Sequence, residues 1–242
     1  NIAKKTGIKD ASVELSENKG FSVSVRMSNT ETIETTREKN ALITVYDGHR
    51  KGVAQTSNFS DDEIRNTVLK AIEIAKYTAQ DSFSGLPDKQ DLEFHPKYIP
   101  LYYPWKLSPE NALEMALVAE SSAFNVSNQI KNSDGASVNS SHGHFYLENT
   151  KGFSGGYPYS RHSLSVAPIA HYKEEMERDF WYSTNRNPQK LSSPSEIGEY
   201  AAKRTLARLG SKKISTRNAA ILFDAPLSSA LVGAFVQAVS GN

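Results

Sequence analysis

The sequence predicts an α+β fold in which a curved, mostly antiparallel sheet carries helices packed on one side. Segments with a two-residue hydrophobic period are separated by turn-forming residues, and segments with a helical period follow them. The order along the chain is strands, helix, helix, strands, helix, strand, helix. Two runs of strands, each followed by helices, favour α+β over a doubly wound sheet and leave an internal duplication open.

The first run of strands covers residues 11–57. Apolar and polar residues alternate over residues 21–27 and again over residues 41–45. Residues 18–20 (Asn-Lys-Gly) and 47–48 (Asp-Gly) tolerate positive φ angles, so we expect turns at both places. The strands are therefore predicted to form an antiparallel meander.

Two helices follow this run. Ser60 precedes three acidic residues and is predicted to open a capping box, and the apolar stripe from Ile64 ends near Tyr77. Ser108 followed by Pro109 predicts the start of a second helix, with a buried stripe over residues 113–123.

The second run of strands begins after Asn132. Short alternating segments predict strands around residues 145–147, 157–159, 162–164 and 176–182. A capping box at Ser193 opens a helix that ends at Gly210. A short buried strand is expected over residues 219–223, followed by a last helix whose apolar stripe spans residues 227–239.

The last helix bears on the domain organisation. Its continuous apolar stripe must be buried by something, and no strands follow it in the sequence. We therefore expect one α+β domain over residues 1–218 and only the beginning of a second domain over residues 219–242.

Composition excludes several classes of protein. The 242 residues carry 28 Lys and Arg against 27 Asp and Glu, and they include no cysteine. The mean hydropathy is −0.51. No segment supplies the ~20 apolar residues of a membrane span. The basic runs are too short to indicate a surface that binds nucleic acid. A disulfide framework and a cysteine nucleophile are excluded within these residues. No signal peptide is visible, and the expected location is the cytoplasm.

His142 and His144 form the best metal-like pair, because alternate residues of a strand share a face. A third ligand could come from His162, Glu177 or Asp179, but the spacing requires none of them, and surface histidines are the favoured interpretation. Zinc at this pair remains an open alternative.

A charged cluster precedes the aromatic residues 180–182. One interpretation is a substrate groove in which Arg178 binds a peptide carboxylate or carbonyl. The candidate groove comprises Arg161, His162, Glu177, Arg178 and Asp179. The alternative, which we favour, is a structural ion-pair network.

Eight segments, in order along the chain, resemble the TldD/PmbA (TldE) family of metalloprotease-related proteins, and specifically its PmbA/TldE branch. They are residues 43–46, 50–52, 66–68, 74–78, 161–165, 176–179, 204–209 and 213–216. The resemblance covers most of residues 8–242 and implies that the chain is the N-terminal half of a family member.

The active TldD branch of that family carries a His-Glu-x-x-x-His motif on a helix, with zinc on the histidines and the glutamate as base. The resemblance places these three positions at Gly233, Ala234 and Ala238, and none of them matches. A hydrogen atom and methyl groups neither ligate a metal nor accept a proton. We therefore expect no metal site and no catalysis by this chain alone.

The resemblance thus implies a non-catalytic subunit of a bacterial zinc metalloprotease complex. Its partner would be a TldD-like paralogue that holds the zinc, in a heterodimer or a higher oligomer, and the chain itself would form interface and substrate cavity. The complex would mature or degrade small peptides and unfolded segments. The alternative is a stand-alone peptide- or protein-binding regulator with no proteolytic role.

Overall fold

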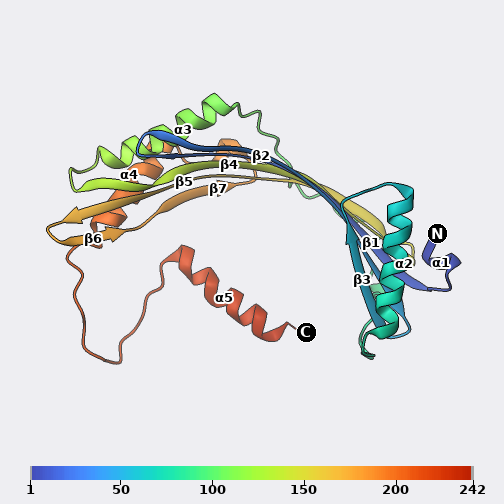
Figure 1. Ribbon diagram of the computed structural model, residues 1–242. Helices are drawn as coiled ribbons and strands as arrows, with labels where there is room; N and C mark the ends of the chain where they lie inside the picture. The colour runs from blue at the N-terminus through green and yellow to red at the C-terminus, as the bar shows by residue number, and fades with distance from the viewer. Residues whose placement is uncertain (1, 241–242) are drawn as a thin grey trace. The chain divides into compact units, whose positions relative to one another are not determined.

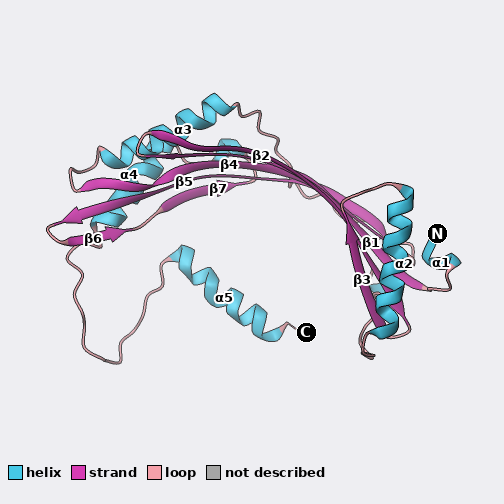
Figure 2. Cartoon of the chain, viewed as in Figure 1, coloured by secondary structure: helices cyan, strands magenta, loops and turns pink. Residues whose placement is uncertain are grey.

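The computed structural model describes residues 2–240, which divide into two compact units, one up to Leu209 and one from Gly210 onward. The first unit is built on a long, curved sheet of seven antiparallel strands (Figures 1 and 2). Its helices share one face of that sheet. This architecture confirms the predicted α+β class, the curved antiparallel sheet and the helices on one side.

Four long strands make up most of the sheet. They are β1 (Asp10–Arg26), β2 (Asn29–Asp47), β4 (Ile130–Asn149) and β5 (Ser154–Tyr172). Three short strands complete it: β3 (Arg50–Thr56), β6 (Glu175–Arg178) and β7 (Trp181–Asn185). The strand order is β3-β2-β1-β4-β5-β6, with β7 also paired to β5. The two runs of strands predicted from the sequence therefore join in one sheet, through the pairing of β1 with β4.

The helices are α1 (Ile2–Lys5), α2 (Asp61–Tyr77), α3 (Pro109–Phe124), α4 (Pro194–Leu206) and α5 (Ala225–Val239), with 3-10 turns η1 (Lys89–Asp91) and η2 (Pro188–Lys190). The predicted starts at Ser108 and Ser193 are confirmed, and Ser193 makes both bonds of a capping box. The capping box predicted at Ser60 is wrong. Asn58 Oδ1 accepts the hydrogen bond from the Ser60 N–H at 3.0 Å, which satisfies the donor that a capping-box glutamate would otherwise take.

The register shows why the helices lie on one face. Val23, Val138 and Leu164 lie opposite one another on β1, β4 and β5, and all three are fully buried in the core beneath α3 and α4. At the other end of the sheet, Ile43 and Val45 pack against α2. They pair with Val13 and Ala11, which share the face of Val23 because side chains alternate along β1.

Over the middle of the sheet, the opposite face is polar. Ser22, Asn139 and Ser163 form one row across β1, β4 and β5, and Ser24, Ser137 and Ser165 form the next. Hydroxyl groups bond along the second row, with Ser137 Oγ 3.0 Å from Ser165 Oγ. We call this surface the polar face.

The turn predicted at residues 18–20 is wrong, because β1 continues through them. The chain reverses instead at Met27 and Ser28, whose φ angles are +51° and +62°. The carboxylate of Glu120 on α3, which is 1% exposed, accepts hydrogen bonds from both backbone N–H groups, at 3.0 and 2.7 Å. A tertiary contact therefore holds a turn in which two non-glycine residues adopt positive φ angles. The turn predicted at residues 47–48 is confirmed, with Gly48 at φ +61°.

The strand predicted over residues 176–182 is interrupted. β6 pairs with residues 169–172 of β5, whereas β7 pairs with residues 162–166. Between these two stretches β5 contains Pro168, which has no N–H to offer a ladder. The break at Asp179 and Phe180 lies at this point.

The short buried strand predicted over residues 219–223 is absent, and these residues are exposed. A strand needs a neighbouring strand, and the described part of the second unit contains only the helix α5. α5 confirms the last predicted helix, but within its unit the side chains of Leu231 and Phe235 are 53% and 67% exposed. Across residues 2–240, each helix is too short or too polar to cross a membrane.

Candidate functional site

The five residues of the candidate groove do not gather on one surface. Arg161 and His162 are neighbours on β5, so their side chains point to opposite faces of the sheet. Arg161 lies exposed on the polar face, whereas His162 is 1% exposed on the helical face.

His162 is part of a buried hydrogen-bonded chain. Its Nε2 lies 2.9 Å from the Tyr103 carbonyl oxygen and its Nδ1 lies 3.0 Å from Ser140 Oγ. Because a carbonyl can only accept, Nε2 carries the proton and Nδ1 accepts from the Ser140 hydroxyl. Burial lowers the pKa of His162, which favours the neutral imidazole. The arrangement ties the segment before α3 to the sheet, and the Trp105 and His162 rings pack in a T-shaped contact with 5.3 Å between their centroids.

Glu177 and Asp179 face α4 and pair with arginines there. The Asp179 side chain, 12% exposed, lies 3.3 Å from Arg204 Nε and 3.8 Å from Arg208 Nη1. Glu177 lies 3.5 Å from Arg208 Nε. The Arg204 guanidinium also lies over the Trp181 ring, 5.0 Å from its centroid. These contacts form an ion-pair network that joins the β6–β7 junction to α4.

Arg178 differs from its two neighbours, because it pairs with Asp134 near the start of β4 and its side chain is 67% exposed. It lines a hollow of about 400 Å³ together with Asp179, Phe180 and Arg208. A second hollow of about 290 Å³ shares Asp134 and Phe180 with the first and reaches Ser24, Ser137 and Ser165 of the polar face. We call the two together the Arg178 hollow. It offers a guanidinium, hydroxyl groups and the Phe180 ring, which stacks on Tyr182, and these groups suit an extended polar ligand.

His142 and His144 lie on the same face of β4, as the sequence predicts. The ring of Tyr102 lies near both, with centroid distances of 6.3 and 6.1 Å. Among residues 2–240, no three His, Asp or Glu side chains come close enough together to hold a metal ion. The geometry therefore gives this pair an aromatic neighbour and no third ligand.

Gly233, Ala234 and Ala238 all lie on α5 and are exposed within the second unit. Their side chains contain no oxygen, nitrogen or sulfur atom. A zinc ion does not fit these three residues, whatever the backbone places beside them.

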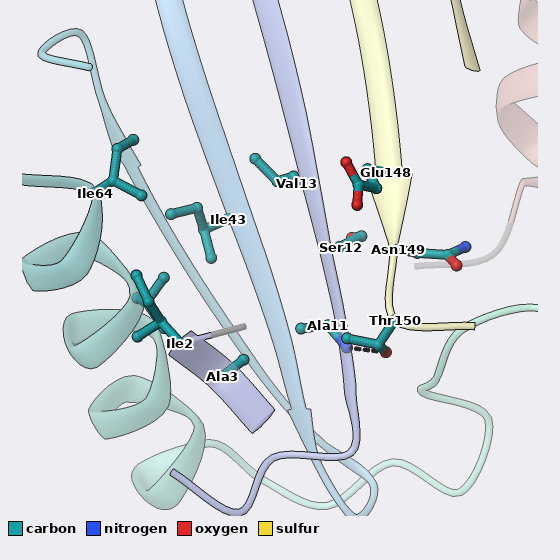
Figure 3. A pocket seen from close by; sticks show the side chains of 11 residues that line it. Ile2, Ala3, Ala11, Ser12, Val13, Ile43, Ile64, Glu148, Asn149 and Thr150 are labelled. Carbon is teal, nitrogen blue, oxygen red and sulfur yellow. Dashed lines mark hydrogen bonds between the residues drawn. The ribbon is translucent and has the colours of Figure 1, made fainter. Parts of the chain in front are cut away.

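A further cavity, of about 350 Å³, lies between α1, α2 and the adjoining ends of β1, β2 and β4 (Figure 3). Val13, Ile43 and Ile64 give it apolar walls, while Glu148 and Asn149 stand at the opposite side. The Thr150 hydroxyl accepts a hydrogen bond from the Ala11 N–H at 3.0 Å. The sequence gives no signal for this cavity, because its apolar residues have the pattern of ordinary core.

Two regions of the first unit match known protein domains. Residues 11–75 match the family described as PmbA/TldA metallopeptidase domain 1, and residues 102–209 match the PmbA/TldA metallopeptidase central domain. The chain is 37% identical over 232 residues to Metalloprotease PmbA of Escherichia coli O157:H7, which covers 96% of this chain and 52% of that protein. It is also 37% identical over 241 residues to the Metalloprotease PmbA homolog of Haemophilus influenzae, covering 100% of this chain and 53% of the relative.

Solved structures share the fold. A protein of Bacteroides thetaiotaomicron described as a modulator of DNA gyrase superposes with a TM-score of 0.80 at 24% identity, over 88% of this chain and 49% of that one. TldE of Thermococcus kodakarensis superposes with a TM-score of 0.71 at 14% identity, over 84% and 45%. The chain spans about half the length of the curated relatives it matches. The two domain matches, in order, and the identity over nearly the whole chain show that it belongs to the PmbA/TldE branch of the PmbA/TldD metallopeptidase family.

Proposed function

We propose that the chain is part of a PmbA/TldE-like subunit of a cytoplasmic zinc metalloprotease complex, and that it holds no catalytic metal of its own. One observation carries the proposal. Nearly the whole of this chain aligns with the metalloprotease PmbA relatives, yet Gly233, Ala234 and Ala238 offer no donor atom where the resemblance places the metal motif.

Because these three side chains offer no donor atom, the two chains of the complex have different roles. A TldD-like paralogue supplies the zinc and the general base, and this chain supplies interface and part of the substrate-binding surface. The substrates are small peptides and unfolded segments. Within this chain the Arg178 hollow is the surface best suited to them, because its guanidinium and hydroxyl groups can bond to peptide carbonyls and carboxylates.

The test mixes the intact protein with the TldD-like paralogue of the same organism. We expect a joint species in sedimentation and hydrolysis of an unstructured fluorogenic peptide, with activity lost on chelation. The matched control is the same mixture with the motif glutamate of the paralogue replaced by glutamine, which should sediment jointly but hydrolyse nothing.

Two results would contradict the proposal. Stoichiometric zinc with metal-dependent peptidase activity in the isolated protein would overturn the non-catalytic assignment. Peptide binding by the isolated protein, with two independent peaks in the mixture, would instead support the stand-alone regulator.

A further inference from the structure

The cavity between α1, α2 and the adjoining ends of β1, β2 and β4 has no role in the proposed function (Figure 3). Its volume of about 350 Å³ falls within the range of small-ligand sites, roughly 300–1,000 Å³. It lies entirely within the first unit of the chain. We call it the α1/α2 cavity.

The packing of α2 fixes the apolar walls of this cavity. At Gly52 the backbone of α2 comes so close to β3 that an added Cβ would meet the Ala71 carbonyl oxygen at 1.9 Å. Val68 and Ile64 lie one and two turns earlier on α2, and both line the cavity together with Ile43 of β2. Ile43 and Val68 also belong to the buried core at this end of the sheet. The apolar walls are therefore preformed, which lowers the entropic cost of binding a small ligand.

One carboxylate faces these walls. Glu148 of β4 lies opposite Val13 of β1, so the two side chains share a face of the sheet, and Figure 3 shows the carboxylate turned toward Val13. Among the described residues that line the cavity, Glu148 is the single ionisable one. It is exposed, and it forms no ion pair with a basic side chain that the structure describes. The cavity therefore combines apolar walls with one negative charge that is not neutralised.

Two further polar side chains at the cavity already have hydrogen-bond partners. Asn149 Oδ1 accepts from the N–H groups of Lys151 and Phe153, at 3.0 and 3.1 Å. Thr150 Oγ1 accepts from the Ala11 N–H at 3.0 Å. The Glu148 carboxylate is therefore the polar group best placed to bind a ligand.

We propose that the α1/α2 cavity binds a small amphipathic ammonium compound, with its hydrocarbon part against α2 and its ammonium group beside Glu148. Charge complementarity selects this class. Glu148 would repel an anion, and a metal ion requires several oxygen ligands rather than one carboxylate. A neutral apolar molecule would desolvate the carboxylate without pairing it. A free amine and the N-terminus of a peptide that begins with an apolar residue both present this chemistry.

Calorimetric titration of the intact protein at neutral pH tests the site, with n-hexylamine as the probe. We expect hexylamine to bind and hexanoate, which has a chain of similar length and the opposite charge, not to bind. Leucinamide imitates a peptide N-terminus, and N-acetylleucinamide removes its charge. Binding of hexylamine without leucinamide would identify a free amine as the ligand, and binding of leucinamide without its acetylated form would identify a peptide N-terminus. Hexanoate binding as tightly as hexylamine, or no binding of either amine at millimolar concentration, would overturn the proposal.

Two matched pairs of variants locate the bound amine. Glu148→Gln should weaken the binding of the amine about fivefold, the upper range for an exposed ion pair. Glu14→Gln removes the same charge from the opposite face of β1 and should leave binding unchanged. Val13→Phe places a ring in the cavity and should abolish binding, whereas Leu15→Phe, on the same face of β1 but outside the lining of the cavity, should not.

Circular dichroism checks that each variant is folded, and the Glu148 and Glu14 pair is decisive even where a phenylalanine variant does not fold. Equal binding by the two members of either folded pair would overturn the proposal. The measurements involve no paralogue and no peptidase activity, so their outcome is independent of the proposed function.

Discussion

The two helix-covered ends of the sheet achieve burial in different ways. Where α2 covers β2 and β3, the contact is apolar, and the buried hydroxyl of Thr67 bonds to the Glu63 carbonyl within its own helix (2.7 Å). Where α3 and α4 cover β4 and β5, the buried Glu120 and His162 bond to segments distant in the sequence. The first end depends on periodicity and close packing, and the second depends in addition on polar contacts that only the fold assembles.

Glu120 provides the largest expected difference between the two ends. Glu120→Ala removes two hydrogen bonds to a charged acceptor and should lower the free energy of unfolding by about 3 kcal/mol, measured by urea denaturation of the intact protein. Glu120→Gln keeps one carbonyl acceptor and should lose about half as much. Hydrogen exchange in the Glu120 variants should be faster than in the wild type at the β1–β2 turn and in α3. An equal increase in α2 would contradict the difference between the two ends of the sheet.

Two glycines allow the same test at both ends. A Cβ on Gly52 would meet the Ala71 carbonyl oxygen at 1.9 Å, and one on Gly198 would meet the Ala119 carbonyl oxygen at 2.1 Å. Each alanine substitution should cost about 1–3 kcal/mol, because a helix must move away. Gly85→Ala is the control, since nothing lies within 4 Å of its added Cβ. We expect Gly52→Ala to speed hydrogen exchange in α2 and Gly198→Ala to speed it in α3 and α4.

His162 should make the α3/α4 end sensitive to pH. Burial lowers its pKa in the folded state below the ordinary value of 6.5, so the unfolded chain takes up a proton more readily as the pH falls. The stability that His162 contributes is present above about pH 6.5 and is lost below it. Urea midpoints at several pH values should show a decline on acidification that is shallower in His162→Gln. An unchanged slope in that variant would contradict the assignment.

Arg178 should have the smallest effect on stability, because its pair with Asp134 is largely exposed. Arg178→Ala should cost less than about 1 kcal/mol. If the Arg178 hollow contacts peptides, kcat/KM of the assembled complex should fall by more than this loss explains. Lys203→Ala, which breaks the exposed pair with Glu199 on α4, is the matched control and should leave peptidase activity unchanged. Equal activity of the two variants would show that Arg178 does not contact the peptide and serves only in its ion pair with Asp134.

Periodicity and capping residues were sufficient to predict much of the fold. The helices α2, α3, α4 and α5 follow from stripes of small and apolar residues with Ser or Pro at their starts, because these signals act within one or two turns. The candidate site was less predictable. Sequence neighbours such as Arg161 and His162 point to opposite faces, and the hollow beside Arg178 is assembled from Asp134 and Phe180, more than forty residues apart.

What the sequence by itself determined about this protein is local: the helices and the starts of α3 and α4, the strand-forming regions, the apolar faces and the absence of side-chain donor atoms at Gly233, Ala234 and Ala238. What only the tertiary structure decided is where the chain turns and what is covered. The Met27–Ser28 reversal depends on a carboxylate 92 and 93 positions away in the sequence. The break between β6 and β7 coincides with a proline on the neighbouring strand. Hydrogen bonds between segments distant in the sequence determine each of these features. A local sequence pattern does not specify which distant segment it will bond to.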